Sequence, residues 1–467
     1  MRLRVDVDVL RRSTKLLSTF GSGRGYFNQK ASYGRFDAHK GGLRLTLTTP
    51  IGAIAMELDA EVKEAGCVGM DLAAFSEYLK HYPAGTHVDL STGFCERTEE
   101  RAILLGVFGT ARNASTTRQE WVIQTRSRGG LLFDEEWVPD PPQQAGELLQ
   151  GVISLSRLKE LVLPALSGYR EDLREMGAMT NGAALVLGSD QLSVYAASSE
   201  GGVQASAWAD AGVELGLQWN HPSQTVWVHG ESLRRAVAAL GAINGLSSVV
   251  LTVPVAEDQP VRLAAAEDPE GFWVLLPRAV VQGMDLPELI TEAARSGEKA
   301  VAKLPTHSGM SSWPLMSALE SLKAYQTHDV GAGQRSSSAA LLELTKESLV
   351  VEVLSDLQVG GTFPWPWSAE PTGRLLRGKR PPLVAVSMSL LLGYLGAVLQ
   401  PIARDLQADV ELVLSIDEDG QERLLLRSES ELGVRVTALV CTMSTTGRRL
   451  ADGFIAAEAE RELVGAA

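Results

Sequence analysis

The sequence predicts an α+β fold made of three similar blocks, each with two helices and antiparallel strands. Six times along the chain, a short strand-like run leads into a small or polar residue and then into an amphipathic helical pattern. The residues expected to cap these helices are Asp8, Asp71, Ser154, Gly230, Ser311 and Ser387. Because the unit recurs at a near-constant interval, the chain is expected to be built by internal repetition.

Strands are expected between the helices, where β-branched and apolar residues alternate. The first block supplies the runs 43–48, 51–58, 101–108 and 120–125. The third block has an Asp419-Gly420 pair between two such runs, which predicts a hairpin turn.

Two stretches are predicted to be linkers. The first is the proline-rich segment 137–144, and the second is the polar segment 291–303. The domains expected from these positions are 1–146, 147–297 and 298–450, followed by a C-terminal tail, 451–467.

Composition bounds the class of protein. The chain has 467 residues, of which 45% are hydrophobic, enough for several domains with proper cores. The net charge of −14 disfavours unspecific binding of nucleic acid by the whole surface, but a locally basic face remains possible. Cys67, Cys95 and Cys441 lie far apart and are expected to be reduced. With no signal peptide and no run of membrane-spanning length, a cytoplasmic protein without membrane contact is expected.

The sequence lacks the motifs of catalysis and cofactor binding. It contains no HExxH, GxSxG or GxxxxGK[ST] pattern. The glycine-rich segment 21–25 follows a helix, whereas a dinucleotide-binding loop must follow a strand. The acidic run 417–419 lacks the downstream glutamate of a calcium loop, so a hairpin tip is the better interpretation. We therefore expect no enzyme activity, no cofactor and no metal.

Cationic residues recur on the predicted helices despite the acidic composition. They are Arg11, Arg12, Lys15, Lys80, Arg157, Lys159, Arg234, Arg235 and Lys323. Cations on equivalent helices indicate one shared positive surface that contacts the phosphates of double-stranded DNA without reading its sequence. The alternative is that these residues form the solvated faces of ordinary helices.

The chain resembles the bacterial DNA polymerase III beta subunit, the DNA sliding clamp. The resemblance is strongest in the first block, at 1–25, 41–62 and 68–91, and is looser at 153–166, 192–198 and 228–240. It implies a DNA-clamp fold of three domains, each with two helices on the inside and sheets outside. It also implies a ring-shaped homodimer that encircles duplex DNA and tethers DNA polymerase.

The resemblance also implies particular site residues. Arg24 matches an arginine-bearing loop that touches DNA in that family, and the helix cations fall at positions lining the hole. A pocket for the linear peptides of DNA polymerase and clamp loader is expected at Tyr195, Val280, Met284, Leu286, Val440 and Met443. The alternative for these six residues is an ordinary core position.

The chain departs from the family in the turn 195–202, in the segment 283–287 and near the end of its last strand. A diverged, clamp-like scaffold that binds replication or repair proteins without encircling DNA is therefore the second hypothesis. An aromatic insert at 360–371 is expected to be a loop folded onto its own sheet or a docking patch. A basic insert at 373–380 is expected either to add phosphate contacts or to be a solvated connector.

Overall fold

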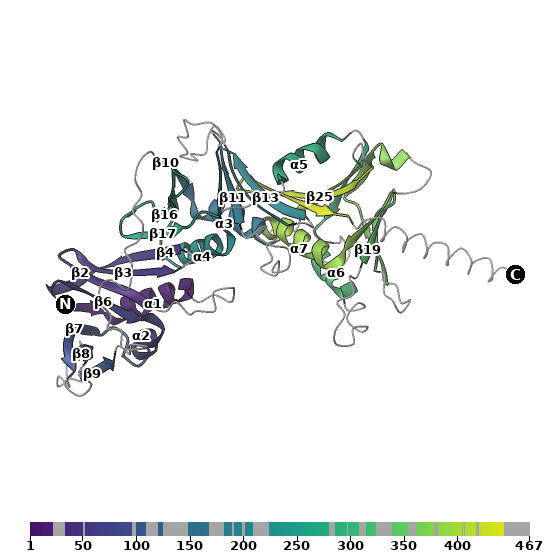
Figure 1. Ribbon diagram of the computed structural model, residues 1–467. Coiled ribbons are helices and arrows are strands. Elements are labelled where there is room, and N and C mark those ends of the chain that lie inside the picture. The colour runs from purple at the N-terminus through teal and green to yellow at the C-terminus, as the bar shows by residue number, and fades with distance from the viewer. Residues whose placement is uncertain are drawn as a thin grey trace. The chain divides into compact units, whose positions relative to one another are not determined.

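The computed structural model describes most of the chain (Figure 1). The described residues are 1–21, 33–49, 52–95, 100–108, 120–124, 148–167, 182–188, 191–198, 201–208, 224–279, 285–296, 298–307, 314–323, 339–353, 361–377, 382–403, 405, 407–416 and 420–442. The expected linker at 137–144, the tail at 451–467 and part of the basic insert lie outside them.

The chain divides into two compact units. Unit 1 contains Met1–Ser156 and Glu231–Ala279, and unit 2 contains Arg157–Gly212, His221–Gly230 and Val280–Ala467. Each unit combines strands from neighbouring predicted blocks, because the blocks share continuous sheets. The three domain boundaries expected from the sequence stay a prediction.

Unit 1 contains two antiparallel sheets. The five-stranded sheet has the order β5 (Ala60–Glu64), β1 (Arg2–Asp6), β7 (His87–Cys95), β8 (Glu100–Phe108), β9 (Glu120–Gln124). The eight-stranded sheet has the order β10 (Leu148–Ser154), β15 (Ser248–Pro254), β16 (Val261–Ala265), β17 (Phe272–Leu276), β4 (Gly52–Leu58), β3 (Gly42–Thr49), β2 (Tyr33–His39), β6 (Gly66–Asp71). The four strands expected in the first block are therefore confirmed.

The helices of unit 1 are α1 (Val7–Gly21), α2 (Leu72–Leu79) and α4 (Gly230–Gly241). Helix α1 buries Leu10, Leu17 and Phe20 with spacings near seven and three residues, so one apolar stripe faces the core. It packs beside α2 and against β3 and β4. Its N-terminus is capped by Asp6, which accepts hydrogen bonds from the backbone N–H groups of Asp8 and Val9. The prediction that Asp8 caps this helix is therefore wrong.

Unit 2 contains a nine-stranded and a four-stranded antiparallel sheet. The larger has the order β14 (Gln224–His229), β11 (Gly182–Leu187), β12 (Gln191–Ser198), β13 (Gly201–Trp208), β26 (Val434–Cys441), β25 (Glu422–Glu429), β24 (Asp409–Ile416), β18 (Glu298–Pro305), β22 (Ala369–Gly373). The smaller has the order β21 (Gly361–Pro366), β20 (Ser348–Val353), β19 (Ala339–Leu344), β23 (Leu383–Ser387). Strands β24 and β25 form the expected hairpin, and Gly420 has a φ of 77° in its turn.

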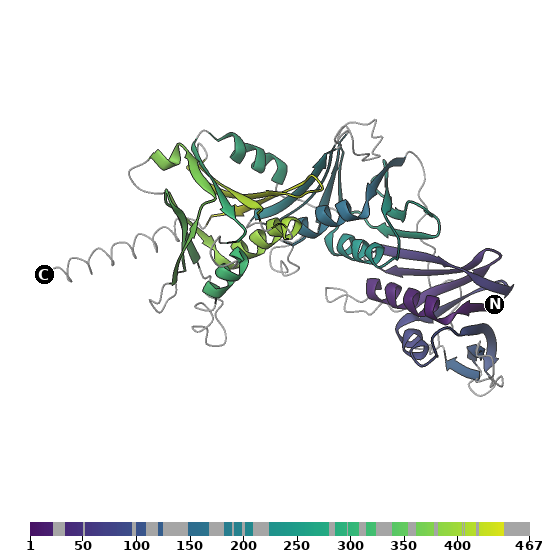
Figure 2. The same cartoon turned by 180° about the vertical axis from the view of Figure 1, so that it is seen from behind.

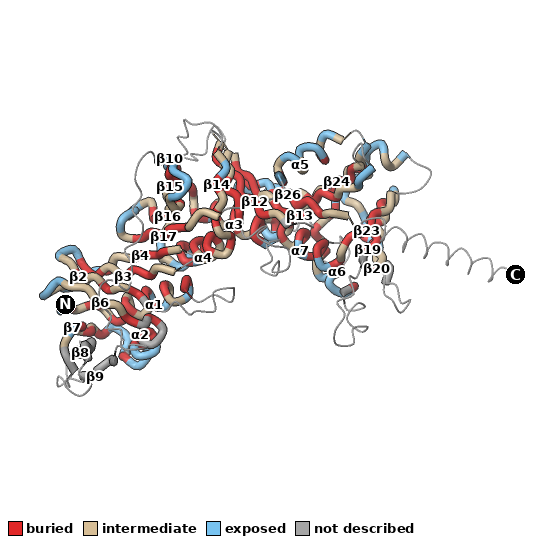
Figure 3. Tube along the Cα trace, viewed as in Figure 1, coloured by how far each residue is buried: buried red, intermediate tan, exposed pale blue. Residues whose placement is uncertain are grey.

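The helices of unit 2 are α3 (Leu155–Ala165), α5 (Leu286–Arg295), α6 (Leu315–Lys323) and α7 (Met388–Leu399), with short 3-10 turns at Leu375–Arg377 and Gln400–Ile402. Helix α7 packs on β25 and β26 from one side of the nine-stranded sheet, and α5 lies on the other side (Figure 1, Figure 2). The buried residues concentrate in the strands between these helices, whereas the outer side of α5 is exposed (Figure 3). None of the helices in the described ranges combines the length and apolar character that a membrane crossing requires.

Two expectations about irregular segments are wrong. The supposed linker at 291–303 is the end of α5 and most of β18. Helix α5 begins where the Asp285 carboxylate accepts from the N–H of Glu288, with Pro287 in the first turn. The aromatic insert at 360–371 is not a loop but the strand β21 and part of β22. Trp365 is 2% exposed and so offers no docking surface, whereas Trp367 is half-buried. The Nε1 atoms of Trp365 and Trp367 donate to the carbonyls of Pro305 and Thr345, each at 3.0 Å.

Candidate functional site

Helix α1 presents two of the predicted cations to solvent. Arg12 and Lys15 are exposed, as is Thr19 one turn further on, so these residues form one surface stripe. The Nε atom of Arg12 donates to the carbonyl of Asp8 at 3.2 Å, which leaves the rest of its guanidinium facing outward. These two side chains have the exposure that a phosphate contact requires.

Arg11, the neighbour of Arg12, is directed towards helix α2 instead. Its Nε and Nη2 atoms donate to the carbonyl of Leu79 at 3.2 and 2.8 Å, and Nη2 donates to the carbonyl of Tyr82 at 2.6 Å. Its Nη1 atom donates to a carboxylate oxygen of Asp8 at 2.9 Å. A cation at the C-terminus of a helix satisfies free carbonyls and complements the helix dipole. The geometry therefore gives Arg11 a role in joining α1 to α2.

Arg235 joins α4 to the end of α1 in a similar way. Its Nη1 atom donates to the carbonyl of Phe20 at 2.7 Å, its Nε atom donates to Glu231 at 2.9 Å, and its side chain is only 13% exposed. Arg234 also contacts Glu231, at 3.0 Å, but is 39% exposed. Of the two arginines, Arg234 is the better placed to contact a phosphate.

The remaining predicted cations differ in their surroundings. Lys80 is exposed at the end of α2 and forms an ion pair with Glu77. Arg157 and Lys159 are half-buried on α3, where the neighbouring Glu160 accepts a hydrogen bond from Ser430 at 2.6 Å. Lys323 is the last residue of α6, but its side chain is not among the parts that the structure describes. Arg24 lies entirely outside the described residues.

The described exposed residues of α6 and α7 include no cation. The exposed side of α7 carries Ser389 and Gly393, and that of α6 carries Ser317, Glu320 and Ser321. Among the described predicted cations, the exposed ones therefore lie on α1 and directly after α2, and Arg234 of α4 is partly exposed; α5 ends in a further exposed cation, Arg295.

The predicted peptide pocket is partly a packed core. Tyr195 is 4% exposed and Leu286 is fully buried, in a cluster with Val413, Leu425 and Leu439 under helix α5. The Tyr195 ring meets the Trp227 ring edge-on, with centroids 5.3 Å apart. Burial, together with the negative charge of Asp285, raises the pKa of Tyr195 to about 12. The geometry of these two residues fits the alternative interpretation, in which they are ordinary core residues.

Val440 does not join this cluster, although the sequence placed it in the same groove. Side chains alternate between the two faces of a strand, and Leu439 faces α5, so Val440 faces the side of α7. The residue of this strand that joins the cluster is Leu439, one position before the predicted Val440. Pattern matching near the end of a strand does not distinguish two adjacent residues. The other three expected pocket residues, Val280, Met284 and Met443, lie outside the described residues.

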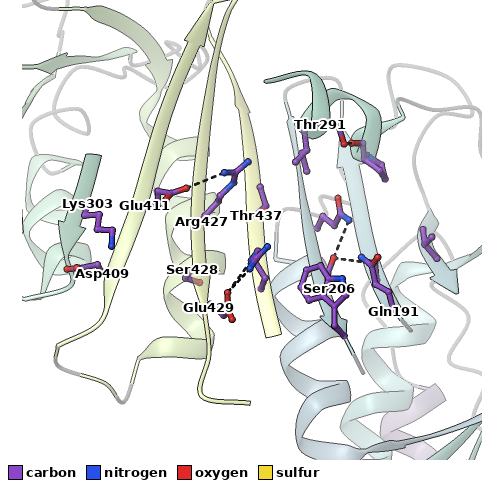
Figure 4. Close-up of a pocket in the computed structure, with 17 residues that line it drawn as sticks. Gln191, Ser206, Thr291, Lys303, Asp409, Glu411, Arg427, Ser428, Glu429 and Thr437 are labelled. Carbon is purple, nitrogen blue, oxygen red and sulfur yellow. Dashed lines mark hydrogen bonds and ion pairs between the residues drawn. The ribbon is translucent and has the colours of Figure 1, made fainter. Parts of the chain in front are cut away.

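A groove of about 860 Å³ lies beside α5 on the same face of the nine-stranded sheet (Figure 4). A polar ladder lines one part of it: Gln191 donates to Ser193 at 2.8 Å, and Ser193 and Ser206 share a hydrogen bond of 2.8 Å. Another part is lined by charged pairs, Arg427 with Glu411 and Arg435 with Glu429. No local sequence pattern predicts this groove, because its residues come from strands far apart in the chain.

Trp208 gives the groove an aromatic wall. The Arg435 guanidinium carbon lies 5.0 Å from the centre of the Trp208 ring. Apolar contact is also offered by Ile290 and Pro287 of α5. The groove can therefore take a partner segment with both polar and apolar side chains, and its charged lining is balanced between Lys303, Arg427, Arg435 and Asp409, Glu411, Glu429.

The fold matches solved structures over most of this chain and nearly all of theirs, although no known family profile and no curated protein matches the sequence. The DNA polymerase beta subunit of Streptococcus pyogenes has a TM-score of 0.69 at 12% identity, covering 95% of this chain and 100% of that chain. The DNA polymerase sliding clamp of Bacillus subtilis has a TM-score of 0.68 at 14% identity, with 95% and 99% covered. The DNA polymerase III subunit beta of Pseudomonas aeruginosa has a TM-score of 0.68 at 15% identity, with 95% and 100% covered. The resemblance found in the sequence is thus confirmed at the level of structure, and the chain has the α+β fold of the bacterial sliding clamps.

Proposed function

We propose that this protein is a DNA sliding clamp, in which two copies form a ring around duplex DNA in the cytoplasm and tether a DNA polymerase. The observation that carries the proposal is the match of the whole chain to sliding clamps over 95% of its own length and nearly all of theirs. The proposal assigns the protein no reaction of its own. Its role is to keep the polymerase on the template.

The charge distribution supports topological rather than adhesive binding. A net charge of −14 repels DNA from most of the surface, so strong unspecific affinity is not expected. The exposed cations Arg12, Lys15 and Lys80, with the more open Arg234, offer weak phosphate contacts that carry no sequence information. A ring that is topologically linked to DNA, and that contacts it only through a few such side chains, can stay on the DNA and still slide along it.

The docking of polymerase and clamp loader through a linear peptide belongs to the same proposal. Tyr195 is buried beneath α5, and Leu286 is the buried first residue of that helix, so neither side chain is open to a peptide in this structure. The neighbouring groove is open to solvent and has both polar and aromatic walls. We place the first contact of such a peptide in this groove, with α5 as its border.

Retention on circular and linear DNA tests the proposal. The purified chain is incubated at high concentration with a nicked circular plasmid, moved to high salt, and separated by gel filtration. High salt removes phosphate contacts but not a topological link, so the protein should stay with the circle. Cutting the loaded plasmid once should release it, and equal retention on the cut and uncut plasmid would contradict encirclement.

A further inference from the structure

The groove beside α5 changes in character along its length (Figure 4). Trp208 gives one part an aromatic wall, and Ile290 of α5 adds apolar surface. Arg435 and Arg427 follow on the next two strands, since β13, which carries Trp208, pairs with β26, and β26 pairs with β25. Neighbouring strands lie about 4.8 Å apart, so the two arginines come roughly 5 and 10 Å after Trp208. The groove therefore fits an elongated segment with an apolar end followed by negative charges.

The carboxylates in the groove leave its cations open to an occupant. Arg435 and its partner Glu429 are 51% and 56% exposed, and a pair so open to water contributes little. The Arg435 guanidinium is also held over the Trp208 ring, which fixes its position at the apolar end. Lys303, on β18, is exposed as well. Carboxylates of an incoming segment can therefore approach these cations from solvent.

The C-terminal tail, 451–467, has a matching order of side chains in its sequence. It contains four acidic residues and one arginine. Phe454 and Ile455 come first, and Glu458 and Glu462 follow at intervals of four residues. On a helix these residues share one face, and the two glutamates come about 6 and 12 Å after Phe454. This spacing is close to that of the two arginines after Trp208 in the groove.

The tail is long enough to reach the groove from the end of β26. Helix α5 crosses β26 at Leu439, so Cys441 lies on one side of the helix and Arg435, in the groove, on the other. The distance back along the strand is about 20 Å. The twelve residues from 443 to 454 span up to about 40 Å, enough to turn back and pass over α5.

The connection to the tail carries charges that suit this path. Arg448 and Arg449 are adjacent in it, and the outer side of α5 presents the exposed Glu288 and Glu292. A basic pair that crosses an acidic helix face is attracted to it, although each such exposed contact is weak. Charge complementarity therefore favours the crossing as well as the groove.

We propose that the groove beside α5 is the docking site of the chain's own C-terminal tail, which lies outside the described residues. Phe454 and Ile455 pack against Trp208 and the apolar side of α5. Glu458 and Glu462 then meet the arginines of β26 and β25. A partner peptide has to displace the tail before it enters the groove, so the tail regulates docking there. Only this regulatory step rests on the proposed function.

Binding of a fluorescein-labelled peptide of sequence 451–467 to the full chain, followed by anisotropy, tests the proposal. In the wild type, the attached tail competes at an effective concentration of about 1 mM, which raises the apparent Kd about tenfold for a peptide whose own Kd is about 0.1 mM. Phe454→Ala with Ile455→Ala in the chain releases the attached tail, so the Kd of the labelled peptide should fall about tenfold. Leu463→Ala with Val464→Ala, on the opposite side of the same helix, is the matched control and should leave the Kd unchanged.

A substitution in the groove locates the binding site. Trp208→Ala, added to the chain with the released tail, should weaken binding of the labelled peptide at least about fivefold. Tyr78→Ala, which removes an exposed aromatic ring of unit 1, should not change it. If Trp208→Ala unfolds the chain, Arg435→Gln takes its place, because that side chain is half-exposed.

The outcomes separate this inference from the proposed function. A peptide that binds the chain with the released tail no better than the wild type, or not at all, overturns the inference. Binding that is unchanged by both groove substitutions also overturns it. Retention on circular DNA is a separate measurement, so a chain that shows competition by its tail but is not retained overturns the proposed function alone.

Discussion

Replacing Arg11 and Arg12 separately by glutamine distinguishes a structural arginine from a DNA-binding one. The two residues are adjacent on α1, and both substitutions remove one positive charge. Arg11 bonds to the carbonyls of Leu79 and Tyr82, whereas Arg12 is exposed and makes one backbone contact. We expect R11Q to lower stability and R12Q to lower DNA affinity.

The magnitude follows from the contacts of Arg11. A hydrogen bond to a charged group contributes about 1.5–3 kcal/mol, and two carbonyl acceptors lose such a donor in R11Q. The Arg11 side chain is 26% exposed, so water replaces part of the loss. Its partly exposed pair with Asp8 adds less than about 1 kcal/mol. We expect R11Q to reduce the free energy of unfolding by about 2–3 kcal/mol, and R12Q to change it by less than about 0.5 kcal/mol.

Urea unfolding followed by circular dichroism measures the first effect, and anisotropy of a labelled DNA duplex at several salt concentrations measures the second. Loss of one phosphate contact makes the slope of log K against log salt shallower by about 0.9, which R12Q should show. Equal stability of the two variants, with R11Q losing the DNA affinity, would refute the assignment of Arg11 to the end of α2.

Four further predictions concern unit 2 and are checked by urea unfolding. Leu286→Ala, at a fully buried position of α5, should lower the free energy of unfolding by about 2–4 kcal/mol. The control Glu288→Gln, at an exposed position of the same helix, should lower it by less than about 0.5 kcal/mol. Equal losses in the two variants would show that α5 is not packed on the sheet. Gly202→Ala should destabilise by about 1–3 kcal/mol, because its Cβ would lie 2.8 Å from both the Ala196 carbonyl and the Leu286 side chain. Gly393→Ala, on the open side of α7, should stabilise by up to about 1 kcal/mol, and the reverse order of the two glycine variants would contradict this packing. The pKa of Tyr195, raised by burial to about 12, means that the folded state disfavours the phenolate. Stability present below pH 10 should fall by roughly 2–3 kcal/mol as the pH rises towards 12, and Tyr195→Phe should remove that part of the decline.

Local patterns were sufficient to predict most elements of the fold. The strands at 43–48 and 51–58 alternate clearly, and both appear as β3 and β4. Helix α5 was missed although its signals are present: Asp285 before the first turn, Pro287 within it, and Leu286, Leu289, Ile290 and Ala293 at helical spacing. Its many acidic and small residues gave the segment the composition of a linker.

The roles of the cations required contacts that no local pattern contains. Arg11 and Lys15 are four residues apart and were expected to share one face, but only Lys15 is exposed. The carbonyls that accept from Arg11 belong to residues 68 and 71 positions away, and the one that accepts from Arg235 is 215 positions away. Charge alone does not distinguish an arginine at the end of a neighbouring helix from one that faces solvent.

Strand β21 shows why an edge strand is hard to recognise from its sequence. Proline removes a backbone donor, so a segment with two prolines normally argues against a strand. On an edge, however, every second N–H needs no partner within the sheet, and prolines at alternate positions cost the existing ladder nothing. The alternation Phe363, Pro364, Trp365, Pro366 fits this rule, with Trp365 buried and both prolines exposed. The number of prolines argues against a strand, but their spacing at alternate positions is compatible with one. It also indicates that the prolines lie at the backbone positions directed towards the open edge, while Phe363 and Trp365 bond to the neighbouring strand.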